Sequence, residues 1–327
     1  MHIVAEDGSE SIWPYSELRQ MPHELRGGEL RLARGEAWLT IEDPRFAAAL
    51  AGIAPGIRRR ARRGLLYGSV ATVVMLAVVG GLWWGMPSIA ARLAPHVPIE
   101  WEKTLADDVE REPWWGKRCT DPAGEAALAK LTRRLTEGVE SPYAISVSVR
   151  DNRLVNAFAL PGGRIVLLRG LIDDAQSPDE VAGVLAHELT HTLNRHPTRA
   201  LIANSGLSLL FELTIGNGTG ASLGLVLTQL SYTRAMEAEA DAGALDLLRR
   251  AGIGSAGFAA FFERLETREE GGGKSKALGF TLPSYLRTHP ATQQRLEAIR
   301  EQGGVGTRPA LEQGEWYALK SMCTAVK

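Results

Sequence analysis

One uncharged stretch divides this chain of 327 residues into parts that cannot share a single core. Residues 65–86 read LLYGSVATVVMLAVVGGLWWGM and carry no charged side chain. A helix of about 20 apolar residues can cross a bilayer, and Trp83 and Trp84 would lie at its interfacial end. The stretch therefore predicts one transmembrane helix. We expect five segments: a small β-rich N-terminal domain (1–57), a basic juxtamembrane stretch (58–64), the transmembrane helix (65–86), a connector (87–118) and a main domain (119–327).

The charges on either side of this stretch predict its orientation. Five arginines precede it at positions 58, 59, 60, 62 and 63, whereas only Arg92 follows before Lys103. Because basic flanks stay in the cytoplasm, we expect a single-pass inner-membrane protein with a cytoplasmic N-terminus and a periplasmic or otherwise extracytoplasmic main domain. A nucleic-acid-binding patch is disfavoured by the net charge of −1. A cleaved signal peptide, suggested by Ala90 and Ala91, is disfavoured because the stretch is long and begins deep in the chain.

Two histidines four residues apart, His187 and His191, enclose Glu188 in the sequence HELTH. Residues four apart on a helix face the same way, so both imidazoles could bind one Zn²⁺. Glu188 would then be placed to deprotonate a water on the metal. The alternative is a surface helix with two solvated histidines.

The flanks of HELTH favour a helix. Ser177 is suited to the cap, Pro178 to the first helical position, and Glu180 completes a capping box. Valines and leucines then recur at helical spacing and predict one buried face. We expect the helix to end at Arg195-His196-Pro197, where the proline would stop it.

A catalytic zinc site needs a third protein ligand. Cys119 and Cys323 lie far from HELTH in the sequence and are poor candidates. In a downstream acidic helical segment, Glu237 and Asp241 are four residues apart and share a face, whereas Glu239 points elsewhere. One of the two carboxylates could bind the metal while the other holds a ligating imidazole from behind. The alternative is an ordinary solvated acidic face.

Four motifs together resemble a known family of zinc endopeptidases. They are HELTH, RAMEAEADAGAL, NAFALPGG (residues 156–163) and Thr288-His289-Pro290 followed by Arg295, and they occur in the family's order between about residues 119 and 300. The family includes HtpX and the CAAX prenyl proteases, and the chain is most similar to its branch typified by BepA and the mitochondrial Oma protease. The resemblance implies a gluzincin fold. It also implies one Zn²⁺ held by His187, His191 and Glu237, with Asp241 behind a ligating histidine.

The last two motifs concern the substrate and the fourth metal position. NAFALPGG lies between two β-rich runs, 145–149 and 164–168, and resembles the family's strand beside the substrate. An exposed edge there would pair with an extended peptide through Asn156, Ala157, Phe158 and Ala159. From the residues alone, a plain hairpin packed on the core is favoured. His289 could donate to the oxyanion as a catalytic residue or fill the fourth metal position as a reversible plug, as the BepA-like branch suggests. A helix-start histidine with no catalytic part is the alternative, and we interpret His196 as structural.

Cys119 and Cys323 are the only cysteines of the chain. In an extracytoplasmic domain they are expected to form a disulfide that ties the chain end to the start of the main domain. Such a bridge closes a very long loop, for which the entropic account predicts a stabilisation of several kcal/mol. Two unpaired buried thiols are the alternative.

The other segments are less specific. Residues 29–32 and 37–41 alternate as strands around an Arg-Gly turn, with a short helix after Asp43-Pro44. The apolar segment 207–230 is interrupted by GNGTG, so we expect two helices that cover the core or the active site, or else a membrane-dipping hairpin. The expected fold class is α+β, mainly helical, with a small β-sheet.

The uncharged stretch and the four motifs together predict a membrane-anchored zinc metalloendopeptidase that hydrolyses peptide bonds. Misfolded or unassembled envelope proteins as its substrates are implied by the resemblance alone. Its expected partners are polypeptide substrates, the lipid bilayer through residues 65–86 and envelope assembly machinery, but no nucleic acid. One alternative is an envelope chaperone or assembly factor with a self-inhibited zinc site. A CAAX-type intramembrane protease is disfavoured because that architecture uses many membrane spans, and this chain offers one.

Overall fold

The structure, a computed structural model, describes residues 1–21, 30–53, 55–204, 232–270, 285–289 and 293–324. These residues form two compact units, Met1–Trp84 and Gly85–Lys327. The apolar segment 207–230 and Pro290 of the predicted histidine loop lie outside the described residues.

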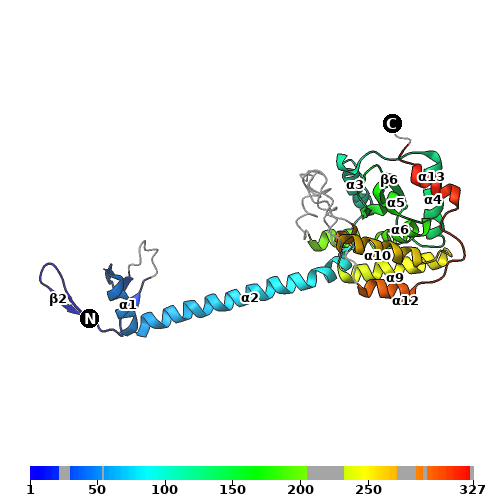
Figure 1. The fold of residues 1–327 in the computed structure, drawn as a ribbon. Coiled ribbons are helices and arrows are strands. Elements are labelled where there is room, and N and C mark those ends of the chain that lie inside the picture. The colour runs from blue at the N-terminus through cyan, green and yellow to red at the C-terminus, as the bar shows by residue number, and fades with distance from the viewer. Residues whose placement is uncertain (22–29, 54, 205–231, 271–284, 290–292, 325–327) are drawn as a thin grey trace. The chain divides into compact units, whose positions relative to one another are not determined.

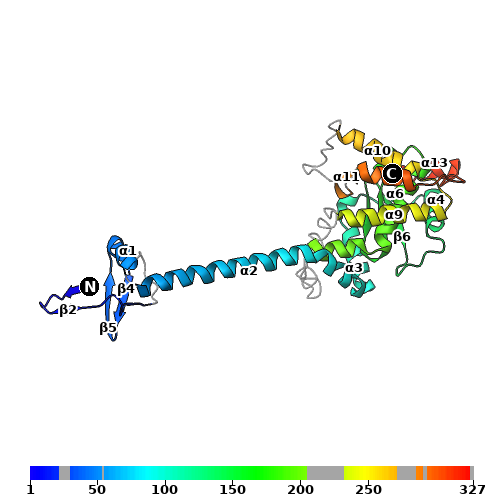
Figure 2. The same cartoon turned by 90° about the horizontal axis from the view of Figure 1, so that it is seen from below.

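The first unit is rich in short strands. β4 (Leu30–Arg34) and β5 (Ala37–Ile41) form the predicted antiparallel hairpin, and β3 (Arg19–Gln20) pairs with β4. A separate pair consists of β1 (His2–Val4) and β2 (Glu10–Ile12). Figure 2 shows β4 and β5 beside α1 (Pro44–Ile53). The core of the unit consists of the buried residues Trp13, Leu18, Leu30, Leu32, Ile41 and Leu50.

The helix α2 (Pro55–Leu93) contains the uncharged stretch of the sequence and is followed by the 3₁₀ turn η1 (Ala94–His96). Among the described residues, no single helix is both long and apolar enough to cross a membrane. Tyr67–Gly81 and Trp84–His96, with a 45° bend between them, meet the requirements of length and composition only together. Membrane insertion of this stretch stays a prediction.

A three-stranded sheet forms the β part of the second unit. β6 (Ser146–Arg150) pairs with β8 (Arg164–Leu168) in parallel, and β7 (Ala157–Leu160) pairs with β8 antiparallel. The order β6-β8-β7 makes β7 an edge strand of this sheet. The turn η3 (Pro161–Gly163) joins β7 to β8, and Gly162 and Gly163 have φ values of 73° and 88°, which favour glycine.

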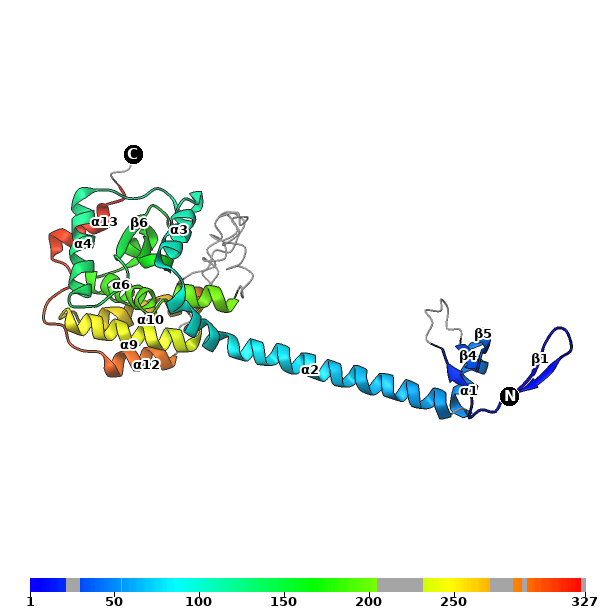
Figure 3. The ribbon, with the colours of Figure 1, turned by 180° about the vertical axis from the view of Figure 1, so that it is seen from behind.

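Helices cover both faces of this sheet. The helical elements that follow η1 include, in chain order, α3 (Ile99–Glu110), η2 (Pro113–Trp115), α4 (Pro122–Thr136), α5 (Arg169–Asp174), α6 (Pro178–Leu193), α9 (Arg234–Arg250), α10 (Ala256–Glu270), α11 (Tyr285–Thr288), α12 (Gln293–Gln302) and α13 (Gln313–Ser321). Figures 1 and 3 show α6 between the sheet on one side and α9, α10 and α12 on the other. The prediction of a mainly helical α+β fold with a small sheet is confirmed.

The helix α6 begins at the predicted residues, but the predicted capping box is not formed, because Glu180 Oε2 accepts a hydrogen bond from the Gln176 amide at 3.0 Å rather than from the Ser177 amide. Ser177 caps it, since its side chain accepts a hydrogen bond from the Glu180 amide at 3.3 Å, and Pro178 takes the first position. α6 stops at Leu193, two residues before the predicted end at Arg195-His196-Pro197, and the proline is not what ends it. Residues 196–204 form a new helical stretch, and Pro197 lies in its first turn, where a missing amide hydrogen costs nothing.

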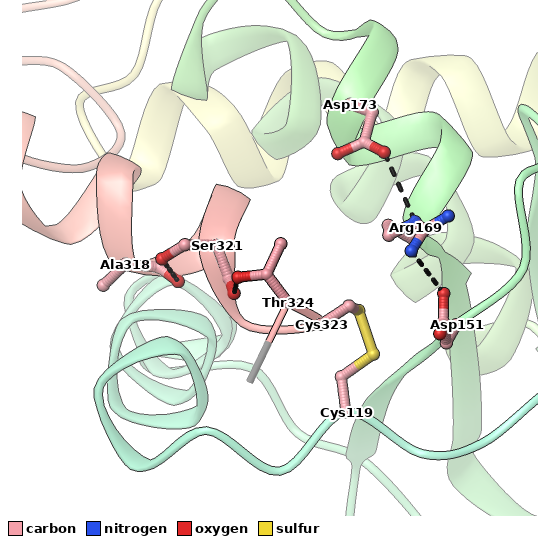
Figure 4. Close-up of a disulfide and its surroundings, with 8 residues drawn as sticks. All are labelled: Cys119, Asp151, Arg169, Asp173, Ala318, Ser321, Cys323 and Thr324. Carbon is pink, nitrogen blue, oxygen red and sulfur yellow. Dashed lines mark hydrogen bonds and ion pairs between the residues drawn. A yellow bond between two sulfur atoms is a disulfide. The ribbon is translucent and has the colours of Figure 1, made fainter. Parts of the chain in front are cut away.

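A disulfide joins the C-terminal end of the second unit to the segment just before α4. Cys119 and Cys323 are bonded at an S–S distance of 1.98 Å and are 204 residues apart in the sequence. The Cys119 amide also donates to the Val149 carbonyl of β6 at 2.9 Å. Figure 4 shows the bridge beside the end of α13, with Arg169 of α5 nearby between Asp151 and Asp173. The bridge thus fixes the C-terminal helix to the start of α4 and to the sheet.

Candidate metal centre

The ligating atoms of the predicted site converge from three elements. On α6, His187 Nε2 and His191 Nε2 are 3.0 Å apart. Glu237 of α9 lies against both, with its Oε1 3.5 Å from His191 Nε2 and its Oε2 3.6 Å from His187 Nε2. His289, which follows α11, brings its Nδ1 to 3.3 Å from His187 Nε2 and 3.1 Å from Glu237 Oε1. Each of these four side chains offers one donor atom, and these atoms lie within 4.8 Å of one another.

This arrangement fits a metal ion. Donors about 2.0–2.1 Å from a tetrahedral zinc are roughly 3.3 Å from one another, which is close to the separations seen here. Three imidazole nitrogens and one carboxylate oxygen are also donors that zinc accepts. The four side chains are buried, with exposed fractions of 2% or less. His187, His191, Glu237 and His289 could therefore hold one cation.

Glu188 lies beside the four candidate ligands, where its carboxylate could act as a base. Its Oε1 accepts a hydrogen bond from Tyr285 Oη at 3.1 Å and lies 3.5 Å from His289 Nε2. Its Oε2 is buried and has no hydrogen-bond partner among the described residues. A buried carboxylate oxygen without a partner is costly, and a water molecule or a substrate group could satisfy it.

Behind His187 stands an ion pair. His187 Nδ1 lies 3.0 Å from Asp241 Oδ1, and Arg295 of α12 binds Asp241 with Nε at 2.6 Å and Nη2 at 2.8 Å. Arg295 Nη1 also lies 2.7 Å from Glu237 Oε2. Asp241 and Arg295 thus hold one candidate ligand each and connect α9 to α12.

These contacts determine the charges of the cluster. Burial alone lowers the pKa of His187, but hydrogen bonds with Asp241 and Glu237 outweigh it and raise that pKa to about 9. Burial raises the pKa of both carboxyls. For Glu237, electrostatic attraction to His289 and hydrogen bonds with His187 and His289 outweigh burial and lower the pKa. For Asp241, hydrogen bonds with Arg295 and His187 outweigh burial and lower the pKa. Both carboxyls therefore have a lowered pKa and stay anionic at neutral pH, which suits a cation between them.

The sequence matches the profile of one protein family, Peptidase family M48, over residues 122–302, which is more than half of the chain. The chain belongs to Peptidase family M48. This confirms the family resemblance read from the motifs, and it supports a metalloprotease.

Several relatives in this family carry metalloprotease names. The metalloprotease LoiP of Escherichia coli is 33% identical over 216 residues, which is 61% of this chain and 79% of LoiP. The mitochondrial metalloendopeptidase OMA1 of Arabidopsis thaliana is 30% identical over 208 residues, 62% of this chain and 39% of that protein. The beta-barrel assembly-enhancing protease of E. coli is 28% identical over 221 residues, 62% of this chain and 43% of that protein. The chain thus spans about two fifths of the length of the last two relatives.

The structure places His196, which we interpreted as structural, against one of the candidate metal ligands. His196 Nδ1 lies 2.9 Å from His191 Nδ1, and His196 Nε2 lies 3.0 Å from Glu239 Oε2. Burial lowers the pKa of His196 to about 4, so the ring is neutral. Glu239 does point away from Glu237 and Asp241, as its helical position predicts, but it reaches the same site through His196. The spacing of five residues between His191 and His196 was the only sequence signal for this contact.

The predicted substrate strand is an edge strand, but its side chains are covered. Ala157, Phe158 and Ala159 are buried, and Phe158 packs edge-on against Trp115 at a ring distance of 5.1 Å. Asn156 is also buried and accepts a hydrogen bond from the Ala157 amide through Oδ1 at 2.8 Å. The Ala159 carbonyl accepts a hydrogen bond from Tyr232 Oη at 3.5 Å, and the Tyr232 ring stacks on His191 at 4.0 Å. Tyr232 therefore links this strand to the metal centre, a contact that sequence reasoning missed.

Proposed function

We propose that this M48 chain is a zinc metalloendopeptidase in which His187, His191 and Glu237 hold Zn²⁺ and Glu188 is the general base. The observation that supports this best is the convergence of the three donors from α6 and α9 beside a carboxylate with one unpartnered oxygen. Two histidines and a glutamate are a ligand set of catalytic zinc.

The chain's own residues supply the proton transfers and the orientation of the ligands. When bound, zinc would polarise the scissile carbonyl and lower the pKa of the attacking water. Glu188 takes a proton from that water on Oε2, while Tyr285 holds Oε1 in place. Glu188 then returns the proton to the leaving amine. Asp241 fixes the ring of His187 throughout.

We further propose that His289 is a reversible fourth ligand rather than an oxyanion donor. Its Nδ1 lies among the donor atoms, at the distances a ligand would have from His187 and Glu237. A substrate carbonyl needs that same position, so His289 must withdraw before peptide cleavage. The resting enzyme is then self-inhibited.

The location and substrates belong to the same proposal. The arginines before residue 65, the uncharged stretch 65–86 and the Cys119–Cys323 bridge support an inner-membrane anchor with the peptidase domain outside the cytoplasm. One relative is named a beta-barrel assembly-enhancing protease, which supports misfolded or unassembled envelope proteins as substrates. Such substrates would pair with β7 once Tyr232 releases the Ala159 carbonyl.

The blocked fourth position also supports a second candidate function, an envelope assembly factor that binds unfolded proteins and rarely cuts them. The two functions differ in the effect of Glu188→Gln. In the peptidase, the full-length variant in detergent should keep its zinc and its binding of an unfolded protein but lose cleavage by about 10²–10⁴-fold. The matched control is Glu125→Gln on α4, whose half-exposed carboxylate pairs only with Arg118, at 3.5 Å, among the described residues. If wild type, control and Glu188→Gln all bind substrate and none cleaves it, the assembly-factor function is correct.

The membrane topology is tested separately. Reporter tags placed before residue 58 and after residue 324 should be accessible from opposite sides of the inner membrane. Non-reducing electrophoresis should show an intact Cys119–Cys323 bridge in cells. Tags on the same side, or a chain recovered with free thiols, would rule out the proposed location.

A further inference from the structure

His191, like His187, has a carboxylate behind it, but here the contact runs through another histidine. His191 Nε2 faces the donor cluster, and its Nδ1 faces His196 Nδ1 at 2.9 Å. His196 Nε2 in turn lies 3.0 Å from Glu239 Oε2, which also accepts from Arg199 Nη1 at 3.1 Å. His191 and His196 have no exposed surface, while the Glu239 side chain is 46% exposed. The chain of contacts therefore runs from the buried centre to the surface of α9.

The proton positions in this chain follow from the chemistry of imidazole. A neutral imidazole has one N–H donor and one nitrogen acceptor. If His191 Nε2 binds a cation, its proton must lie on Nδ1, and this proton is donated to His196 Nδ1. The remaining proton of His196 must then lie on Nε2, where it is donated to Glu239. One arrangement of protons satisfies every contact, and it is the one that frees His191 Nε2 for a metal.

The backbone holds His196 in this place. Arg195 has φ 54°, the only left-handed non-glycine residue among the described residues, and this turn follows directly after the end of α6. Arg195 is fixed there by its Nη2, which lies 2.8 Å from the Val97 carbonyl and 2.9 Å from the buried Glu102. A disfavoured backbone conformation that persists in this way is one that surrounding contacts enforce. Here it folds His196 back under His191.

Each of the two candidate metal histidines of α6 thus has a carboxylate of α9 behind it, Asp241 directly for His187 and Glu239 through His196 for His191. His187 is backed by Asp241 and Arg295, and His191 is backed by His196, Glu239 and Arg199. We propose that His196 and Glu239 are positioning residues that hold His191 in the tautomer and orientation that present Nε2 to the metal. This inference rests on the proposed zinc function, because it assigns a role toward that ion.

The test measures zinc affinity of the full-length chain by competition with a chromogenic chelator. Glu239→Ala should weaken zinc binding by about 10–100-fold, the usual effect of removing the partner of a ligating histidine. Glu239→Gln, which can still accept from His196, should restore part of this loss. Asp246→Ala is the matched control, since Asp246 is a comparably exposed carboxylate on α9 that pairs only with Arg249 and Arg250 among the described residues.

A positioning role is distinguished from a structural one by the zinc-free protein. Its thermal midpoint should be the same in wild type, Glu239→Ala and Asp246→Ala, so that only the metal-bound state is affected. His196→Phe should give the larger loss of affinity, and the Glu239 variants keep the test decisive if that protein does not fold. Unchanged affinity in Glu239→Ala, or a loss matched by a lower zinc-free midpoint, would overturn the inference. Failure of the wild type to bind zinc would instead overturn the proposed function itself.

Discussion

The candidate metal centre combines candidate ligands on two long packed helices, α6 and α9, with one histidine after a four-residue helix, and these two parts are held differently. α6 and α9 approach so closely that a Cβ on Gly243 would lie 2.3 Å from Thr190 Cγ2. Asp241 and Arg295 then fix His187 and Glu237 on these helices. Besides its contacts with the other donors, His289 relies on its own short segment: its ring stacks on Tyr285 at 4.6 Å, and its amide donates a hydrogen bond to the Tyr285 carbonyl at 2.9 Å. The helical part should therefore set metal affinity, and His289 should set access.

The largest expected effect is that of removing the helical ligand Glu237. Glu237→Ala takes away a donor oxygen and also one of the two carboxylates that face Arg295. Zinc affinity should fall by more than about 100-fold, the upper range for outer partners of a ligand. Metal analysis after gel filtration measures this, with Glu263→Ala on the exposed side of α10 as the control. Full zinc content in Glu237→Ala would show that the ligand set is wrong.

A smaller loss is expected from the residue behind the ligand. Asp241→Asn keeps the size of the side chain but removes the charge that His187 and Arg295 share. Zinc affinity should fall by about 10–100-fold, because a ligating histidine loses its anionic partner. Asp246→Asn should leave the affinity unchanged, since that exposed carboxylate only pairs with Arg249 and Arg250 among the described residues. Equal affinities of the two variants would remove Asp241 from the site.

The helical part was also the part that sequence could predict. The start of α6 follows from Ser177 and Pro178, and the shared face of Glu237 and Asp241 follows from helical spacing alone. These are local rules that act within a few residues. They give the direction of a side chain along its own helix, and the family resemblance supplied the pairing of α6 with α9.

What the sequence missed depends on contacts between distant segments. The end of α6 and the placement of His196 rest on a left-handed turn at Arg195, which is held by Glu102 about ninety residues earlier. Arginine carries no signal for that conformation, as glycine would. The stacking of Tyr232 on His191 and of Tyr285 on His289 likewise arises only from packing. The apolar segment 207–230 lies outside the described residues, so its predicted helices stay a prediction.

The close approach of α6 and α9 gives a third test. Gly243→Ala would normally favour a helix, but the added methyl group meets Thr190 of α6. Overpacking of this kind costs about 1–3 kcal/mol, and it should also separate Glu237 from His187 and weaken zinc binding. Denaturant unfolding and chelator competition measure the two effects. Gly314→Ala in α13 is the control, because its added methyl group meets nothing within 4 Å. A Gly243→Ala protein as stable as the control would show that α6 and α9 can shift apart freely.

The smallest effect on metal affinity is expected at His289, together with a gain of activity. His289→Ala should lower zinc affinity by less than about tenfold, because three ligands on α6 and α9 suffice for a catalytic zinc. Cleavage of an unfolded protein should become faster, because the fourth position is then open to substrate. His96→Ala, at an exposed histidine of η1, should change neither quantity. Slower cleavage with zinc retained would instead make His289 an oxyanion donor, and loss of zinc would make it an obligatory ligand. Either result would end the distinction between a helical part that binds the metal and a histidine that controls access to it.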